Sequence, residues 1–465
     1  MLQVPVEELE IEPGYAVEWT LSFAGAIRPD DAAGTQPAGS YNQEDHFGVA
    51  RTLRQADFPY SSYIGGSFEI PGALDREALE AALLHFVRRH EVLRCVFRES
   101  DGALALDVVG PQDVKLEAAD VGQLGTREEA RSYVQGFLRG TSTLRGPWLV
   151  MGAVIRDDST TVYFACDHLV TDGVSTPVAV SDIATAYQAI RDGRRVMLPE
   201  AAGYLGHAGR ERRRGRSMDA DDARLDHWKA FTARNNGLFP PFPLDLGMHP
   251  GGRYGAVNET DTLLAAGPAA AMEAHCRAAG GRLSTGVLAA VAVSLHREGG
   301  PEVYRALLPV STRDRGPEAH SMGWFVNTLP VEFSVAQGRG FAEVIGAAQG
   351  ALADMRRSAD APFVRAYELL TAQQSGPRVW PLAVNFFSYL DFRRTPGAQH
   401  HVAWKARKYV WASHSNGIFF WFHRNDTGVH LNTIHVDTPQ ARRTKAGFVR
   451  TLTRTMDHIA GHGTF

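Results

Sequence analysis

Apolar and polar residues alternate in several short segments of the first two hundred residues, and segments with helical spacing lie between them. Alternation is typical of half-buried strands, and apolar residues three or four positions apart are typical of amphipathic helices. We therefore expect strands and a hairpin at residues 15–23, 63–72, 94–109 and 146–168. We expect helices at residues 74–93, 127–139 and 176–193.

The composition changes between residues 194 and 256, where a charged stretch is followed by a Pro- and Gly-rich one. We interpret this as an amphipathic crossing segment and a linker. A second succession of helices and strands follows: helices at 269–281, 284–298 and 341–358 and strands at 303–310, 325–334, 378–392, 417–424 and 428–436. The sequence thus predicts an α/β protein of two lobes, residues 1–193 and residues 194–465, with a groove between them.

Composition excludes several classes of function. The longest apolar stretch is much shorter than the roughly 20 residues of a membrane span, and the acidic start lacks a secretory leader. The formal charge of −4 gives no reason to expect nucleic-acid binding. Three widely spaced cysteines match neither a disulfide framework nor a metal site, so we expect a cytoplasmic protein without bound metal. The basic run at 210–216 predicts a solvated helix face, with an acidic partner as the alternative.

The stretch "YFACDHLVTDGVS", residues 163–175, combines an apolar strand with a polar turn and a helix. His168 is expected at the mouth of the turn, where α/β sheets place chemistry, with Ser175 or Thr176 capping the helix. Asp172 can return beside His168, and Gly173 permits close approach and a positive φ. A histidine held in this way could accept a proton from an attacking amine or hydroxyl. The alternative is a capped turn with a purely structural histidine.

Five stretches, taken in order, give the sequence a resemblance to a known family. They are "SYNQEDHF" with Gln43, "LDREALEAALLHFVRRHEVLRCVF", "DHLVTDGVS", "LLPVSTRDRGPEAHSMGWFVNTLPV" and "VNFFSYLDFRR". Together they resemble the condensation domains of nonribosomal peptide synthesis, in particular free-standing members, within the chloramphenicol-acetyltransferase-like superfamily. The resemblance implies two such lobes with mixed sheets in a V-shape around a central channel.

The resemblance also implies roles for single residues. His168 falls on the catalytic histidine of the family's HHxxxDG motif, and Gly173 on a glycine whose N–H faces the developing oxyanion. Asp172 is implied to be structural and to form an ion pair between the lobes with Arg313, or else with Arg315.

Other positions are implied to shape or support the site. Trp324, Asn327 and Ser388 are expected to line the channel, and His90 to pack and form hydrogen bonds.

The chain departs from the family at Asp167, where the motif has its first histidine. The acid also fits the DxxxxDxxS signature of heterocyclization relatives, although His168 and Gly173 favour condensation. Because successive strand residues point to opposite faces, we expect Asp167 to be a scaffold residue at the site. A silent relative that recruits carrier-bound partners is a further alternative.

The family implies an acyltransferase of natural-product biosynthesis, such as antibiotic biosynthesis. We expect it to take an acyl or aminoacyl group from the phosphopantetheine thioester of an acyl or peptidyl carrier protein and to pass it to a small amine or alcohol. No cofactor is expected to be bound. No nucleic acid or membrane partner is expected, and the protein is expected to be a monomer. Ester and amide products, and carrier and coenzyme A donors, remain alternatives.

Overall fold

The computed structural model describes residues 1–23, 38–58, 60–100, 102–235, 237–336, 340–371 and 383–465. Its residues form two compact units. The first unit contains residues 1–213, 312–326 and 392–412, and the second contains residues 214–311, 327–391 and 413–465. The sequence predicts a single boundary after residue 193. In the structure the first unit extends to residue 213 and also contains two later segments, residues 312–326 and 392–412. One of them carries a strand that pairs inside the first sheet, which no local pattern indicates.

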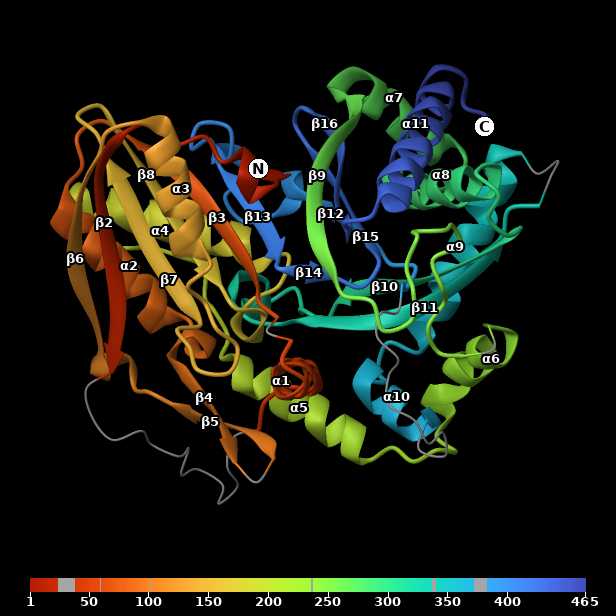
Figure 1. The fold of residues 1–465 in the computed structure, drawn as a ribbon, viewed down its shortest axis with the longest axis horizontal. Helices are drawn as coiled ribbons and strands as arrows, with labels where there is room; N and C mark the ends of the chain where they lie inside the picture. Colours follow the sequence, from red (N-terminus) through yellow and green to blue (C-terminus); the bar gives the residue numbers. More distant parts are fainter. Residues whose placement is uncertain (24–37, 59, 101, 236, 337–339, 372–382) are drawn as a thin grey trace. The chain divides into compact units, whose positions relative to one another are not determined.

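A seven-stranded mixed sheet forms the centre of the first unit. Its strands, in spatial order, are β1 (Leu2–Val4), β13 (Arg407–Ala412), β3 (Ser62–Pro71), β8 (Ser159–Cys166), β7 (Leu149–Ile155), β2 (Gly14–Phe23) and β6 (Val114–Leu124). Only β1 and β13 run parallel among these neighbours. Figure 1 shows β2, β6, β7 and β8 as one twisted layer crossed by α3 (Arg127–Leu138). Apolar residues of α3 pack on this face, while α2 (Arg76–Arg89) and α4 (Ser175–Arg191) pack against each other.

The other helices of the first unit, α1 (Tyr41–Gln55) and most of α5 (Tyr204–Arg216), contact each other through charged residues. The side chain of Arg212 on α5 is only 15% exposed, forms an ion pair with Glu44 and lies over the ring of Tyr41. The predicted solvated face of the basic run is therefore wrong for Arg212. A guanidinium can cover an aromatic ring and bind a carboxylate together, which makes a partly buried position favourable.

The second unit contains a five-stranded mixed sheet and a separate pair of strands. The sheet has the order β12 (Phe387–Asp391), β15 (Ile418–Asn425), β16 (Gly428–Val436), β9 (Tyr254–Ala265) and β14 (His414–Ser415), and the pair is β10 (Val303–Ser311) with β11 (Val326–Ser334). Its helices are α6 (Asp226–Asn235), α7 (Ala266–Ala278), α8 (Leu283–Arg297), α9 (Phe341–Arg357), α10 (Phe363–Thr371) and α11 (Pro439–His462). The helix α8 is almost entirely buried, which explains its continuous apolar sequence.

The predicted α/β class with mixed sheets is confirmed, and the predicted strands and helices are mostly present. The helix expected at 74–93 ends at Arg89, and a short 3-10 turn follows it. The hairpin at 94–109 is formed by β4 (Cys95–Ser100) and β5 (Ala103–Val108), although Asp101 in its turn lies outside the described residues. Residues 378–382 of one expected strand also lie outside them, and β12 covers only 387–391. The V-shape and the channel between the lobes stay predictions.

In the described part of the chain, no single helix is long and apolar enough to cross a membrane. The pair α7 and α8 meets the criterion only jointly and is bent by 95°.

Candidate active site

The turn after β8 is held by Asp167, which is 1% exposed. Its Oδ1 accepts a hydrogen bond from the Leu169 N–H at 2.9 Å, and its Oδ2 accepts one from the Thr143 hydroxyl at 2.5 Å. Burial by itself would raise the pKa of Asp167, but the interaction with His46 and these hydrogen bonds outweigh it and lower that pKa. These contacts fit the expected scaffold role.

Helix α1 fastens the same turn from outside the motif. Ser40 and Gln43 form a capping box at the start of α1, so the position of the Gln43 side chain is fixed. The Gln43 amide then donates a hydrogen bond at 2.6 Å to the carbonyl of Leu169. The residue that the resemblance singled out in α1 therefore supports the turn that carries His168.

His46 is a residue of this site that the sequence did not reveal. It lies one helical turn after Gln43, on the same face of α1. Its Nε2 is 3.7 Å from Asp167 Oδ1, and its ring centroid is 5.9 Å from that of His168. The sequence contains one signal for His46. His46 lies three residues after Gln43 in "NQEDHF", so a helix that brings Gln43 to the motif also brings His46 there.

His168 presents a neutral imidazole to its surroundings. Its ring is partly exposed and lies 3.8 Å, between centroids, from the ring of Trp324. Its Nδ1 is buried, which leaves Nε2 as the accessible nitrogen. Burial and the neighbouring His46 lower the pKa of His168 to about 4, so the ring is neutral at pH 7 and can accept a proton.

Asp172 and Arg313 form the expected ion pair, with Arg313 Nη2 at 2.8 and 2.9 Å from the two carboxylate oxygens. Both side chains are buried, and Asp172 also accepts hydrogen bonds from the N–H groups of Val174, Ser175 and Phe325. Burial would raise the pKa of Asp172, but the Arg313 charge outweighs it and lowers that pKa. Because residues 312–326 belong to the first unit, the expected link between the two lobes is corrected to a link inside one unit. Arg315 is exposed and is not the partner.

One local prediction for the turn, the helix cap, is wrong. Ser175 and Thr176 lie inside α4 rather than capping it, because the Asp172 carboxylate accepts the first N–H groups of the helix. Gly173 does not have a positive φ. A Cβ atom at Gly173 would have only the Lys408 ammonium within 4 Å, at 3.9 Å. Glycine therefore leaves open space here.

The remaining predicted residues are distributed over both units. His90 is buried, with its Nε2 2.9 Å from Asp182 and its Nδ1 accepting the Met322 N–H, which confirms its packing and hydrogen-bonding role. Asn327 belongs to the second unit, where its amide holds the carbonyls of Ala359 and Ala361. Ser388 lies on β12 of that unit and is partly exposed. The role of Asn327 and Ser388 in lining the channel stays a prediction.

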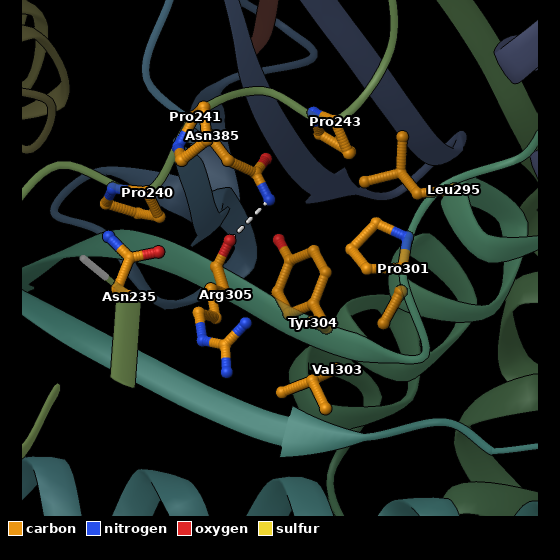
Figure 2. A pocket seen from close by; sticks show the side chains of 11 residues that line it. Asn235, Pro240, Pro241, Pro243, Leu295, Pro301, Val303, Tyr304, Arg305 and Asn385 are labelled. Atoms are coloured by element: carbon orange, nitrogen blue, oxygen red, sulfur yellow. Dashed lines mark hydrogen bonds between the residues drawn. The ribbon is translucent and has the colours of Figure 1, made fainter. Parts of the chain in front are cut away.

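Two cavities of the structure do not have His168 in their lining. One, of about 180 Å³, lies in the second unit and is lined by prolines, Tyr304 and Asn385. Figure 2 shows the Asn385 amide donating to the carbonyl of Arg305, at 2.7 Å. The other, of about 120 Å³, lies in the first unit beside Trp148 and Val170. The lining of neither cavity contains a side chain that could act as a neutral base. His168 therefore stays the candidate for the proton acceptor.

Comparison with known proteins gives this geometry its family. Residues 53–392 match the model of the condensation domain. The chain is 27% identical over 385 residues to the 2'-acyl-2-O-sulfo-trehalose (hydroxy)phthioceranyltransferase PapA1 of Mycobacterium tuberculosis, covering 82% of this chain and 74% of the relative. It is 26% identical over 460 residues to the acyltransferase PapA3 of the same organism, covering 97% and 95%.

A solved structure of the PapA2 acyl transferase has the same fold, with a TM-score of 0.87 and 24% identity over 99% of this chain and 100% of that one. The motif, the fold and the named relatives agree. The chain belongs to the condensation-domain family and is an acyltransferase of the condensation type.

Proposed function

We propose that the protein transfers an acyl group from the phosphopantetheine thioester of a carrier protein to a hydroxyl group of a small acceptor, in the biosynthesis of a natural product. The observation that carries this proposal is the neutral, partly exposed His168 ring, which is held against Trp324 with Nδ1 buried. Such a ring can accept a proton at Nε2 without first having to lose one.

The acceptor class is supported by a relative. The name of PapA1 gives an acylated, sulfated trehalose as its substrate, and trehalose offers hydroxyl groups and no amines. An ester is accordingly the proposed product, with amide formation as the alternative that the experiment below separates.

The reaction follows from the geometry. The acceptor hydroxyl gives its proton to His168 Nε2 as its oxygen bonds to the thioester carbonyl carbon, and the carbonyl electron pair moves onto the carbonyl oxygen. When that pair returns, the carbon–sulfur bond breaks and the imidazolium returns the proton to the leaving thiolate. The products are an ester and a free thiol, and no acyl-enzyme forms. Asp172, Arg313, Asp167 and Gln43 keep the turn in place during this sequence.

Reconstitution tests the proposal. The protein is mixed with the acyl-loaded carrier protein or the matching acyl-coenzyme A, each with an alcohol and with an amine, and the products are measured by intact mass. We expect ester formation from the carrier-bound donor, and His168→Ala is expected to reduce turnover by about 10²–10⁴-fold.

The other outcomes contradict parts of the proposal. Full activity of His168→Ala would remove its role as base, and amide products would reassign the acceptor. Tight carrier binding without any turnover would support a recruiting protein instead.

A further inference from the structure

Lys408 is a buried lysine in the first sheet. It lies on β13, between Gln3 on β1 and Gly66 on β3, and is 3% exposed. Its Nζ donates a hydrogen bond at 2.9 Å to the Gln3 side-chain oxygen. Among the described residues it forms no ion pair with a carboxylate. An ammonium without a carboxylate is costly to bury, so its position calls for a negative partner.

The ammonium lies near Gly173, in the turn that follows His168. A Cβ built on Gly173 would lie 3.9 Å from Lys408 Nζ and would meet nothing else within 4 Å. Gly173 is itself partly exposed. Gly173 therefore has room beside it for another group, and the Lys408 ammonium borders that room.

Near Gly173 two cationic side chains, Arg313 and Lys408, accompany one carboxylate, that of Asp172. The Asp172 carboxylate is occupied by Arg313 and by backbone N–H groups, so its charge is already offset. The first turn of α4 contributes the positive end of a helix dipole at the same place. Lys408 adds a full charge, and an oxygen carrying negative charge is the group that this arrangement would stabilise.

The protonation state fits such a role. Burial lowers the pKa of Lys408 to about 8, against the opposing effect of Asp172. The ammonium form therefore predominates at pH 7 and is lost as the pH rises through about 8. Among the described residues, Asp172 is the charged group whose interaction raises the pKa of Lys408, and Arg313 pairs with the same carboxylate.

We propose that Lys408 is a catalytic residue of the acyl transfer, whose ammonium stabilises the negative carbonyl oxygen formed when the acceptor adds to the thioester. This inference rests on the proposed function. The electron pair that moves onto the carbonyl oxygen is held beside Gly173 by Lys408 and returns to the carbon when the carbon–sulfur bond breaks. Lys408 gains and loses no proton in this step.

Three variants test the role. Lys408→Met removes the charge with a side chain that is only one atom shorter, and Lys408→Arg keeps the charge. Lys405→Met is the matched control, because Lys405 is an exposed lysine of the same segment and pairs with Glu69. We expect Lys408→Met to lower kcat by about 10²–10³-fold with little change in KM, and Lys408→Arg to retain part of the activity. Lys405→Met should behave like the wild type.

Two further readouts separate catalysis from structure. Removing a desolvated charge should leave the Tm of Lys408→Met unchanged or higher, whereas a structural role predicts a lower Tm. The wild-type rate should decline above about pH 8, and this decline should be absent in Lys408→Met. A raised acceptor KM with an unchanged kcat, or activity of Lys408→Met within twofold of the wild type, would overturn the proposal.

A binding measurement distinguishes this inference from the proposed function. Inorganic sulfate, a tetrahedral oxyanion, is titrated calorimetrically into the wild type, Lys408→Met and Lys405→Met. Binding that is lost only in Lys408→Met supports the anion site even if no loaded carrier protein is turned over. Equal sulfate binding by all three proteins would contradict it, even if His168 proves essential.

Discussion

The ion pair between Asp172 and Arg313 can be tested by exchanging Asp172 for Asn. The change removes the negative charge but nearly preserves the shape, so Arg313, whose side chain is 5% exposed, keeps a buried charge without a carboxylate. Removing one partner of a buried ion pair typically costs about 3–5 kcal/mol. We expect a loss of that size in the free energy of unfolding of the first unit.

Urea unfolding followed by tryptophan fluorescence measures this loss, with the midpoint of the affected transition as the readout. The matched control is Arg127→Met, which breaks an exposed pair with Glu12 in the same unit and should cost at most about 1 kcal/mol. The double variant Asp172→Asn with Arg313→Met removes both charges. It should cost less than the sum of the single changes by more than about 1 kcal/mol.

The pH dependence of the same pair has a defined sign. The pKa of Asp172 is lowered from 3.8 on folding, so its stabilising contribution is complete above that value and is lost as the pH falls below it. A cost of Asp172→Asn below about 1 kcal/mol, no larger than that of Arg127→Met, would refute the reasoning that this pair fixes the turn.

Two further predictions concern the surroundings of His168. His46→Ala removes a group that lowers the pKa of His168, so the acid limb of the pH–rate profile, near pH 4 in the wild type, should move to higher pH. The rate at pH 7 should fall by about 10–100-fold because the turn is held less firmly. An acid limb that stays in place would contradict the contact between His46 and His168. Gly173→Ala should change the free energy of unfolding by no more than about 0.5 kcal/mol, because φ is not positive and the new methyl group meets only Lys408 Nζ at 3.9 Å. The methyl group should nevertheless slow the reaction, because it fills the room beside residue 173. The urea midpoint measures the first effect and steady-state kinetics the second, and an unchanged kcat would show that no reactant enters there.

The substitution of aspartate for the first motif histidine has a structural explanation. The Asp167 carboxylate accepts hydrogen bonds from the Leu169 N–H and the Thr143 hydroxyl. It also lies near His46, which belongs to helix α1. A histidine ring is thus present near His168, although it comes from α1 and not from the motif. This arrangement gives Asp167 a role in positioning the turn.

Much of the fold and part of the site could be predicted from local sequence. Alternating and helical spacing located most strands and helices, because burial of one face acts on neighbouring residues of the same segment. The strand, turn and helix around His168 came from one continuous stretch, and the order of five stretches led to Arg313 as the partner of Asp172. These features depend on contacts within a segment or on the resemblance of segments.

Only the tertiary structure brought His46 and Lys408 to the motif. His46 reaches His168 because α1 is fastened to the turn through Gln43, and Lys408 reaches Gly173 because β13 pairs with β1 and β3. The same pairing assigned residues 392–412 to the first unit. Strand register and helix docking depend on the packing of segments that are distant in the sequence. The local sequence of one helix or strand does not specify which element it packs against.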